Sequence, residues 1–342
     1  MDISPRALGM AGSFAALADD VYSMNYNPGG LGQLYVPEVS AMYLSGFEDS
    51  KLNYIGIGSP LPFLGMSKTA KPVAGLSLAF SGSGDFTHRV INPDGTITSR
   101  NLKAESDTVL TFSYGEKFYS GEVNLEGYMA KLDQFFGASV KYVKSELLGY
   151  SGKAVAFDAG YLVIEPNLGL SLGASVSNVG GGIKYISEKN PLPVIFRTGI
   201  SYQKPTIMDQ TLILAVGGDI YANESVSTLK CGLEYHFQEI LNLRLGYKLK
   251  DDNKGLTMGL GVQHEGFSMD FGMTLSNEVF NTTQIAVSYK FANFKIKEYK
   301  RQKRFKEPEK KESEQIKKPS RTEQQRRKEP EKKKKEEFFW IY

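Results

Sequence analysis

The chain has 342 residues, with 41 Lys or Arg against 38 Asp or Glu and a formal net charge of +3. Its mean hydropathy is -0.29, and no stretch approaches the ~20 consecutive apolar residues of a membrane-spanning helix, which argues against helical membrane spans. A single cysteine, Cys231, excludes an intrachain disulfide, and three histidines, His88, His236 and His264, lack metal-ligand spacing. We therefore expect no metal and no cofactor.

The chain begins MDISPRALGM, which lacks the charged start and the apolar core, roughly 7 to 15 residues long, of a secretory signal peptide. Because the features described below predict an outer-membrane protein, we expect that upstream sequence is missing and that Met1 is not the native start. The alternative is a protein that stays in the cytoplasm.

Residues 5 to 34 read PRALGMAGSFAALADDVYSMNYNPGGLGQL and have small residues at nearly every second position without strand-like alternation. They are not predicted to form a barrel strand. Ser13 is placed to cap a short helix over FAALADDVYSM. Asn27 followed by Pro28, Gly29 and Gly30 predicts a turn, because proline favours extended geometry before it and glycine permits positive φ.

From about residue 36 to Phe291 the chain is a series of alternating segments. Reading alternation together with turn residues predicts fourteen strands, with twelve or sixteen as alternatives. An even count suits a single-chain outer-membrane barrel. The predicted strands are 36–47, 51–60, 73–83, 105–115, 132–146, 152–164, 168–178, 193–203, 210–221, 226–236, 241–250, 255–264, 267–276 and 283–291.

The last predicted strand, TQIAVSYKF, shows why a membrane barrel is favoured over a soluble sandwich. Side chains alternate with period two, so one face carries Ile285, Val287, Tyr289 and Phe291 and the other carries Gln284, Ala286, Ser288 and Lys290. One face suits lipid and the other water, and a long series of such strands ending in an aromatic residue is typical of a transmembrane β-barrel. Tyr289 and Phe291 are the predicted barrel C-terminal signal.

The connections between the strands are a second test of this interpretation, since outer-membrane barrels pair short periplasmic turns with longer outer loops. If the first strand rises from the periplasm, residues 84–104 and 179–192 are the long outer loops. The short connections 165–167 and 265–266 then fall on the periplasmic side. The connections 61–72 and 116–131 are long for that side and fit less well.

The run RALGMAGSFAALADD followed by NYNPGGLGQL resembles the entry motif of the FadL-like outer-membrane transport proteins, especially the branch with PorV and PorQ. Ala11 and Gly29 depart from that motif, although both are small. The matching residues are Arg6, Gly9 and Gly12 in the opening, Asp19 and Asp20 in the acidic pair, and Asn27, Pro28, Gly30 and Leu31 in the turn.

This resemblance implies a fourteen-stranded barrel, residues 36–291, whose N-terminal segment, residues 1–35, folds inward as a hatch. A barrel much wider than eight strands has a lumen that its own side chains do not fill, so a hatch is physically reasonable. Burying Asp19 and Asp20 is costly without partners, and strand phase suggests Lys141 or Arg197 as lumen partners.

Two transport functions follow from the resemblance. The FadL branch implies passive uptake of hydrophobic molecules, and the PorV branch implies an accessory role in protein secretion. The polar character of 84–104 and the shortness of other outer loops favour the compact PorV-like form, although Phe47, Phe86 and Ile91 would line a weak outer apolar site. No nucleophile with a histidine base and no carboxylate cluster emerges, so an enzyme is not expected.

The composition changes after Phe291. Residues 295–342 hold 19 Lys or Arg and 10 Asp or Glu, a net +9, so residues 1–294 carry -6 of the whole-chain +3. Such charge density with few apolar residues predicts a disordered tail, residues 292–342. The tail is either simply solvated or a periplasmic tether to the cell wall or a periplasmic protein. Its mixed charge argues against nucleic acid. The predicted docking tip is Phe338, Phe339, Trp340, Ile341 and Tyr342.

Two other classes remain open at this point. A structural outer-membrane barrel would share the fold and the lipid contacts but transport nothing. A soluble all-β binding protein would explain the missing signal peptide and would purify without detergent.

Overall fold

The computed structural model describes residues 2–46, 50–61, 71–125, 128–205, 210–224, 226–238, 240–251, 253–276 and 281–291. Two sets of residues for which we made predictions lie outside the described ranges, and those predictions stay untested. They are Phe47 and the tail from residue 292 onward, with the docking tip Phe338, Phe339, Trp340 and Tyr342.

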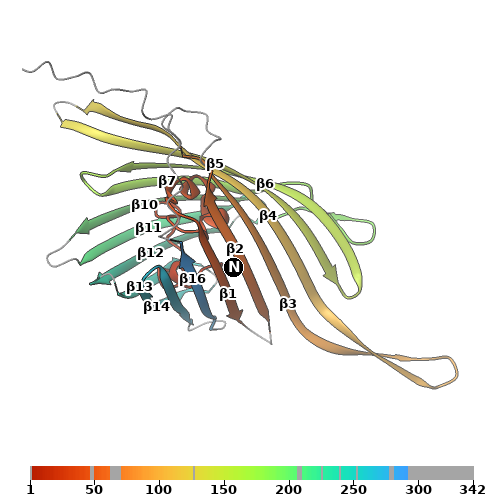
Figure 1. Cartoon of the computed structure of the whole chain (residues 1–342). Coiled ribbons are helices and arrows are strands. Elements are labelled where there is room, and N and C mark those ends of the chain that lie inside the picture. The colour runs from red at the N-terminus through yellow and green to blue at the C-terminus, as the bar shows by residue number, and fades with distance from the viewer. Residues whose placement is uncertain are drawn as a thin grey trace, which may run out of the picture. The chain divides into compact units, whose positions relative to one another are not determined.

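Fourteen of the described strands close into one antiparallel barrel, as predicted (Figure 1). Neighbours in sequence are neighbours in the sheet, and β1 closes the ring by pairing with both β2 and β16. Two short strands, β8 (Ile183–Lys184) and β9 (Lys189–Asn190), form a separate hairpin between β7 and β10. The barrel strands are β1 (Glu38–Ser45), β2 (Lys51–Pro60), β3 (Val73–Ile91), β4 (Ile97–Leu125), β5 (Tyr128–Leu147), β6 (Tyr150–Glu165), β7 (Leu170–Gly180), β10 (Ile195–Pro205), β11 (Thr211–Tyr221), β12 (Val226–Phe237), β13 (Leu241–Lys250), β14 (Gly255–His264), β15 (Phe267–Ser276) and β16 (Thr283–Lys290).

The strands alternate between an apolar outer face and a small or polar inner face. In β16 the side chains of Gln284 and Ser288 are buried, whereas Ile285, Val287 and Tyr289 are 38–39% exposed on the outside. Glu38 at the start of β1 lies opposite Lys290 at the end of β16, and we call this end of the barrel the terminal rim. The opposite end is the far rim.

Aromatic side chains collect on the outer face toward both rims, which is the girdle arrangement of membrane barrels. Near the terminal rim, some of them are direct cross-strand neighbours, as Phe136 with Tyr161 and Phe267 with Tyr289 are. The exposed band between the girdles is apolar and suits a lipid environment. Exposed aromatics toward the far rim are Tyr43, Phe80, Tyr142, Phe196 and Tyr247.

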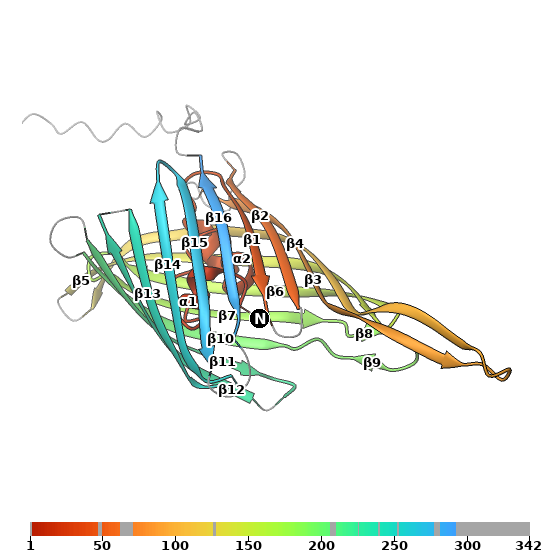
Figure 2. The same ribbon diagram turned by 90° about the horizontal axis from the view of Figure 1, so that it is seen from below.

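The expectation of a loop over residues 84–104 was wrong. These residues continue β3 and β4 as a paired ribbon to Ile91 opposite Ile97, and the ribbon projects past the far rim (Figures 1 and 2). We call residues 83–105 the β-arm. At its tip, Asp94 accepts hydrogen bonds from the backbone N–H and the hydroxyl of Thr96, and Gly95 takes a φ of +81°. The sequence NPDG therefore forms a tight turn that connects β3 to β4.

The expectation of a long connection at 116–131 was also wrong, because here too the strands continue as a paired ribbon. Its described residues belong to β4 and β5, which pair out to Leu125 opposite Tyr128. The ribbon therefore extends past the terminal rim, and backbone pairing satisfies the polar groups that a loop would leave to water.

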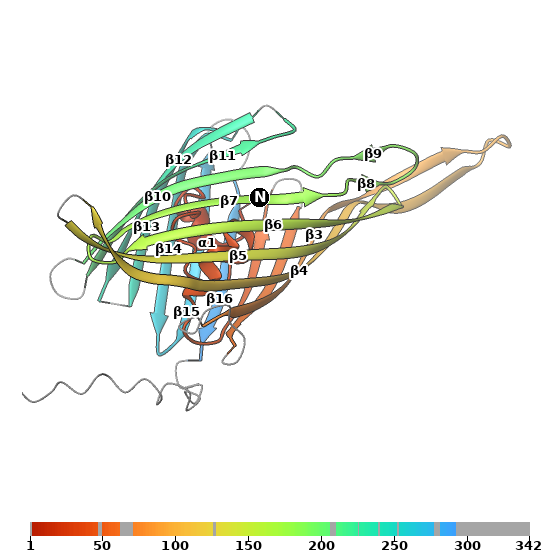
Figure 3. The ribbon, with the colours of Figure 1, turned by 90° about the horizontal axis from the view of Figure 1, so that it is seen from above.

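Residues 2–34, which we call the N-terminal segment, lie inside the ring of strands (Figures 2 and 3). The segment contains α1 (Pro5–Gly9), α2 (Ser23–Tyr26) and the 3-10 helix η1 (Pro28–Gln33). None of the helices among the described residues is long and apolar enough to cross a membrane.

The predicted helix over FAALADDVYSM, capped by Ser13, is not present. Helix α1 begins earlier, and Ser4 caps it by accepting a hydrogen bond from the N–H of Ala7 at 3.2 Å. Ala11 and Gly12 then take φ values of 57° and 79°, which turn the chain out of the helical path before Ser13. The Ser13 hydroxyl has no hydrogen-bond partner among the described residues.

Candidate functional site

The contact between the N-terminal segment and the inner wall of the barrel is the candidate site. Twelve strands each place one glycine against the segment, and we call this set the glycine belt. A Cβ atom on Gly232 would lie 2.7 Å from the Cβ of Met10, and one on Gly272 would lie 2.5 Å from the carbonyl oxygen of Pro5. The belt consists of Gly58, Gly75, Gly115, Gly137, Gly160, Gly173, Gly199, Gly217, Gly232, Gly246, Gly259 and Gly272.

The glycine belt is in register across much of the barrel. Gly137 is the direct cross-strand partner of both Gly115 and Gly160, and Gly199 is the partner of both Gly173 and Gly217. These rows form a shallow track in which the backbone of the segment approaches the backbone of the wall, which glycine alone permits. Sequence reasoning missed the belt, although the signal was one glycine per strand at matching depth.

One side of the N-terminal segment is held by charge. The Arg6 guanidinium forms ion pairs with Asp19 and, at 3.6 Å, with Asp20, both in the segment, and with Glu234 of β12 at 2.9 Å. Glu234 also pairs with Arg244 at 2.7 Å, and Arg244 with Asp270 at 2.6 Å. The charges therefore alternate along an ion-pair chain from the segment into the wall.

The observed partner of Asp19 and Asp20 differs from the lumen partners that strand phase predicted. Lys141 and Arg197 do face the lumen, as strand phase predicted, but Lys141 pairs with Asp158 at 2.6 Å and Arg197 lies 3.7 Å from Asp219. The wall thus supplies its own carboxylates to these cations. Asp19 and Asp20 receive their cation from Arg6, because the path of the segment brings residues far apart along it together.

The surroundings of Asp19 and Asp20 shift the pKa values of their carboxyl groups in opposite directions. Burial raises the pKa of Asp20 to about 6; the Arg6 guanidinium opposes this rise and the neighbouring Asp19 carboxylate adds to it. Burial alone would also raise the pKa of Asp19, but the closer contact with Arg6 lowers it below its ordinary value. Asp19 is thus the permanent anion of the pair.

The turn of the motif is held by hydrogen bonds from one buried amide. The Asn27 side chain donates to the carbonyl oxygens of Ala15 at 2.8 Å and Tyr161 at 3.0 Å, and accepts from the N–H of Gly29 at 3.1 Å. Pro28 opens η1, and a Cβ on Gly30 would collide with Ala18. In the opening, a Cβ on Gly9 would lie 2.9 Å from the Cα of Gly259. The motif residues therefore set the path of the segment and its contact with the wall.

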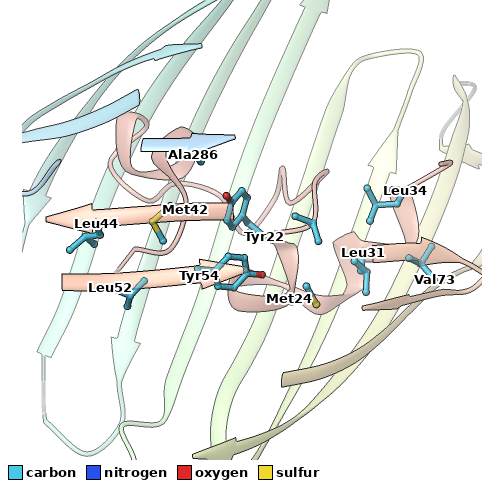
Figure 4. Close-up of a cluster of buried hydrophobic side chains, with 11 residues drawn as sticks. Tyr22, Met24, Leu31, Leu34, Met42, Leu44, Leu52, Tyr54, Val73 and Ala286 are labelled. Carbon is cyan, nitrogen blue, oxygen red and sulfur yellow. The ribbon is translucent and has the colours of Figure 1, made fainter. Parts of the chain in front are cut away.

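The other side of the N-terminal segment packs mainly through apolar side chains, with Tyr22 and Tyr54 among them (Figure 4). Leu31 is fully buried there, and the rings of Tyr22 and Tyr54 have centroids 5.1 Å apart. We call this group the apolar cluster. It contains Val21, Tyr22, Met24, Leu31 and Leu34 from the segment and Met42, Leu44, Leu52, Tyr54, Val73 and Ala286 from β1, β2, β16 and the start of β3.

A cavity of about 340 Å³ lies between the N-terminal segment and the ends of β5, β6, β7 and β10 at the terminal rim. We call it the rim cavity. The segment contributes Leu17, Asp19 and Gln33 to its lining, and the wall contributes Phe135 and Gln203 among others. Sequence reasoning did not predict this cavity, because its lining comes from five separate parts of the chain.

The expected outer apolar site is only partly described. Phe86 belongs to β3, but its side chain lies outside the described residues, as Phe47 does. Ile91 is 74% exposed at the end of the β-arm. Among the described residues, no group of three or more His, Cys, Asp or Glu side chains is arranged to hold a metal ion.

No protein-family model matches the chain, and no curated protein matches it in sequence. The fold is similar to the toluene transporter TodX of P. putida, with a TM-score of 0.56 and 10% identity over 84% of this chain and 98% of TodX. The chain thus shares its fold with a protein described as a toluene transporter. The toluene transporter TbuX of Ralstonia pickettii gives a TM-score of 0.53 at 11% identity over 84% and 98% of the two chains. The monoaromatic hydrocarbon channel CymD gives 0.51 at 12% over 84% and 97%.

All three neighbours are described as transporters or channels. The fourteen-stranded barrel implied by the FadL-like motif is therefore present, and these transporters and channels have a similar fold. At 10–12% identity the likeness is one of fold, and the finer assignment to a PorV or PorQ branch stays a prediction.

Proposed function

We propose that the protein is a passive outer-membrane channel for small hydrophobic molecules, with the N-terminal segment as its hatch and the terminal rim toward the periplasm. The observation that carries the proposal is the seating of the segment: it touches a glycine on twelve strands, so a solute must displace part of it to pass. The similarity in fold to proteins described as toluene transporters supports a hydrophobic solute.

The two sides of the segment suggest which part moves. Opening the charged side separates Arg6 from the fully buried Glu234 carboxylate, which then keeps only one of its two arginine partners, Arg244. Opening the apolar cluster separates none of the ion pairs formed by the described residues, and a hydrophobic solute can replace the lost apolar contacts. The hatch therefore opens at the apolar cluster and stays anchored at Arg6.

Two engineered disulfides test this mechanism, both in a Cys231→Ser background to remove the free thiol. Leu31→Cys with Gly115→Cys joins the apolar cluster to β4, where a Cβ on Gly115 would lie 2.9 Å from that of Leu31. The same Cβ would lie 2.8 Å from the Gly32 nitrogen and the Pro28 carbonyl oxygen, so the oxidised variant is compared with its own reduced form, which carries the same overpacking. The matched control is Ala15→Cys with Gly199→Cys, whose Cβ atoms would be 3.6 Å apart near the anchored side.

We expect the Leu31–Gly115 disulfide to stop uptake of labelled toluene by cells that lack other transporters of this fold, and reduction to restore it. The Ala15–Gly199 disulfide should leave uptake near the level of the reduced protein. Uptake that continues with Leu31–Gly115 oxidised contradicts opening at the apolar cluster. Uptake that does not depend on the protein at all contradicts the channel.

A second function, an accessory role in protein secretion, is favoured by the β-arm. The arm is a paired ribbon beyond the barrel whose tip exposes Ile91 and Ile97, at 74% and 65%, as a polypeptide contact surface would. Residues 84–104 form most of this strand pair rather than the polar outer loop expected from the sequence. Removing residues 86–101 should abolish secretion but not toluene uptake if this second function is correct.

A further inference from the structure

The rim cavity has the size of a small-ligand site. Its volume of about 340 Å³ exceeds the ~150 Å³ of an engineered protein cavity that binds benzene, and it falls at the lower end of the ~300–1,000 Å³ of ligand pockets. One aromatic ring with a small substituent therefore fits in it.

Part of the lining is apolar and suits such a ring. Phe135 of β5 is 1% exposed, and Leu17 of the N-terminal segment is 7% exposed. Ile164 at the end of β6 adds a branched side chain from the wall. These three groups come from both the segment and the wall, so the apolar surface exists only while the segment is seated.

The charged groups of the lining are already paired. Asp133 accepts a hydrogen bond from Lys117 at 2.8 Å and from Ser120 at 2.6 Å. Asp19 pairs with Arg6, although its side chain is 40% exposed. Because each carboxylate has a cation, the cavity offers no uncompensated charge, and a charged ligand would lose its hydration without gaining a counter-ion.

The neutral polar groups of the lining retain hydrogen-bonding capacity. Gln33 donates through its side-chain nitrogen to the carbonyl oxygens of Leu17 at 2.8 Å and Ala18 at 3.2 Å, which leaves its amide oxygen as an acceptor. The side chains of Ser171 and Gln203 make no hydrogen bond to any other described residue. An amide and a hydroxyl both donate and accept, and so does the hydroxyl of a ligand.

We propose that the rim cavity binds a small neutral phenol or alcohol, with its ring against Phe135 and its hydroxyl on Gln203 and Ser171. Binding itself is independent of transport. That the cavity binds a transported solute on the periplasmic side of the hatch rests on the proposed function. A solute that has passed the apolar cluster then meets a site that prefers a hydroxylated ring over a bare one.

The test uses the purified full chain in detergent and ¹⁹F NMR titration with three probes of similar size. We expect saturable binding of 4-fluorophenol, binding of 4-fluorotoluene at least ~10-fold weaker, and no saturable binding of 4-fluorobenzoate. Equal binding of 4-fluorotoluene and 4-fluorophenol, or tighter binding of 4-fluorobenzoate, overturns the proposal.

Two variants locate the binding. Ser171→Trp fills the cavity and should abolish saturable binding of 4-fluorophenol, whereas Ser99→Trp on the exposed β-arm should leave it unchanged. Gln203→Leu should weaken 4-fluorophenol about 10-fold and leave 4-fluorotoluene unchanged. Heat-modifiable gel migration verifies that each barrel is folded. Unaltered 4-fluorophenol binding in folded Ser171→Trp places the ligand elsewhere and overturns the proposal, whatever the result of the uptake experiment.

Discussion

Arg6 of the N-terminal segment pairs at 2.9 Å with Glu234 of β12, a carboxylate whose side chain has no exposed surface. The two residues are 228 positions apart in the chain. This ion pair joins the segment to the wall, and Arg244 on the far side of Glu234 continues it into β13. The seating of the segment therefore depends on a connected set of charges rather than on one exposed pair.

Arg6→Met should loosen the segment without unfolding the barrel. Removing one partner of a fully buried pair costs about 3–5 kcal/mol. We expect a smaller loss of about 1–3 kcal/mol here, because Glu234 keeps Arg244 and the Asp19 side chain is 40% exposed. We expect faster proteolysis and faster hydrogen exchange across residues 5–34, with unchanged heat-modifiable migration. Lys141→Met is the control, since its partner Asp158 belongs to the wall. Equal protection of the segment in Arg6→Met and the parent protein would contradict the anchoring role.

Gly232→Ala should displace the segment from the glycine belt. The new methyl group would lie 2.7 Å from both the Cβ and the carbonyl oxygen of Met10. Because backbone atoms cannot move aside as a flexible side chain can, we expect overpacking to destabilise the seated segment by about 1–3 kcal/mol. Protease sensitivity of the segment measures the effect. Gly82→Ala is the matched control, because its nearest neighbour is at 3.3 Å and belongs to β4 rather than to the segment. The same sensitivity in both variants would mean that the belt does not seat the segment.

Protection of the segment should depend on pH through Asp20. Its pKa is about 6 when seated against an ordinary value of 3.8, so the seated state binds the proton more tightly. The stabilising effect of this proton is greatest at low pH and is lost as pH rises through about 6. Protection factors in residues 5–34, corrected for the intrinsic pH dependence of amide exchange, should therefore be larger at pH 4.5 than at pH 7.

Asp20→Asn is the control for this pH effect, because the amide does not titrate. Most of the difference between pH 4.5 and pH 7 should disappear in this variant. Asp19 does not produce the same trend, since its lowered pKa keeps it ionised across this range. A pH dependence that survives in Asp20→Asn would assign the effect to another group.

Shortening the β-arm should leave the barrel intact. The pairing of β2 with β3 ends at Gly82, and the pairing of β5 with β4 ends at Glu105, so the described residues of 86–101 pair within the β-arm and with no other strand. We expect a variant lacking residues 86–101 to keep its thermal stability within about 0.5 kcal/mol and its heat-dependent gel shift. A large loss of stability would show that the arm supports the barrel.

The strand pattern and the ends of most strands could be predicted from the sequence. In β16, Gln284, Ala286 and Ser288 face inward and Ile285, Val287 and Tyr289 face outward, as predicted. The β-arm could not be predicted in this way. Residues 84–104 have weak alternation, and their pairing depends on a register set by the turn at Asp94 and Gly95.

The sequence by itself determined the antiparallel barrel, because alternation with period two is a local property of an extended backbone between lipid and lumen. It also placed Arg6, Asp19 and Asp20 in one motif. The tertiary structure alone decided that Arg6 serves both aspartates and Glu234, that Lys141 and Arg197 serve the wall, and that one glycine per strand forms a track. Those contacts depend on inter-strand register and on the path of the segment, and both bring together residues that are far apart in the sequence.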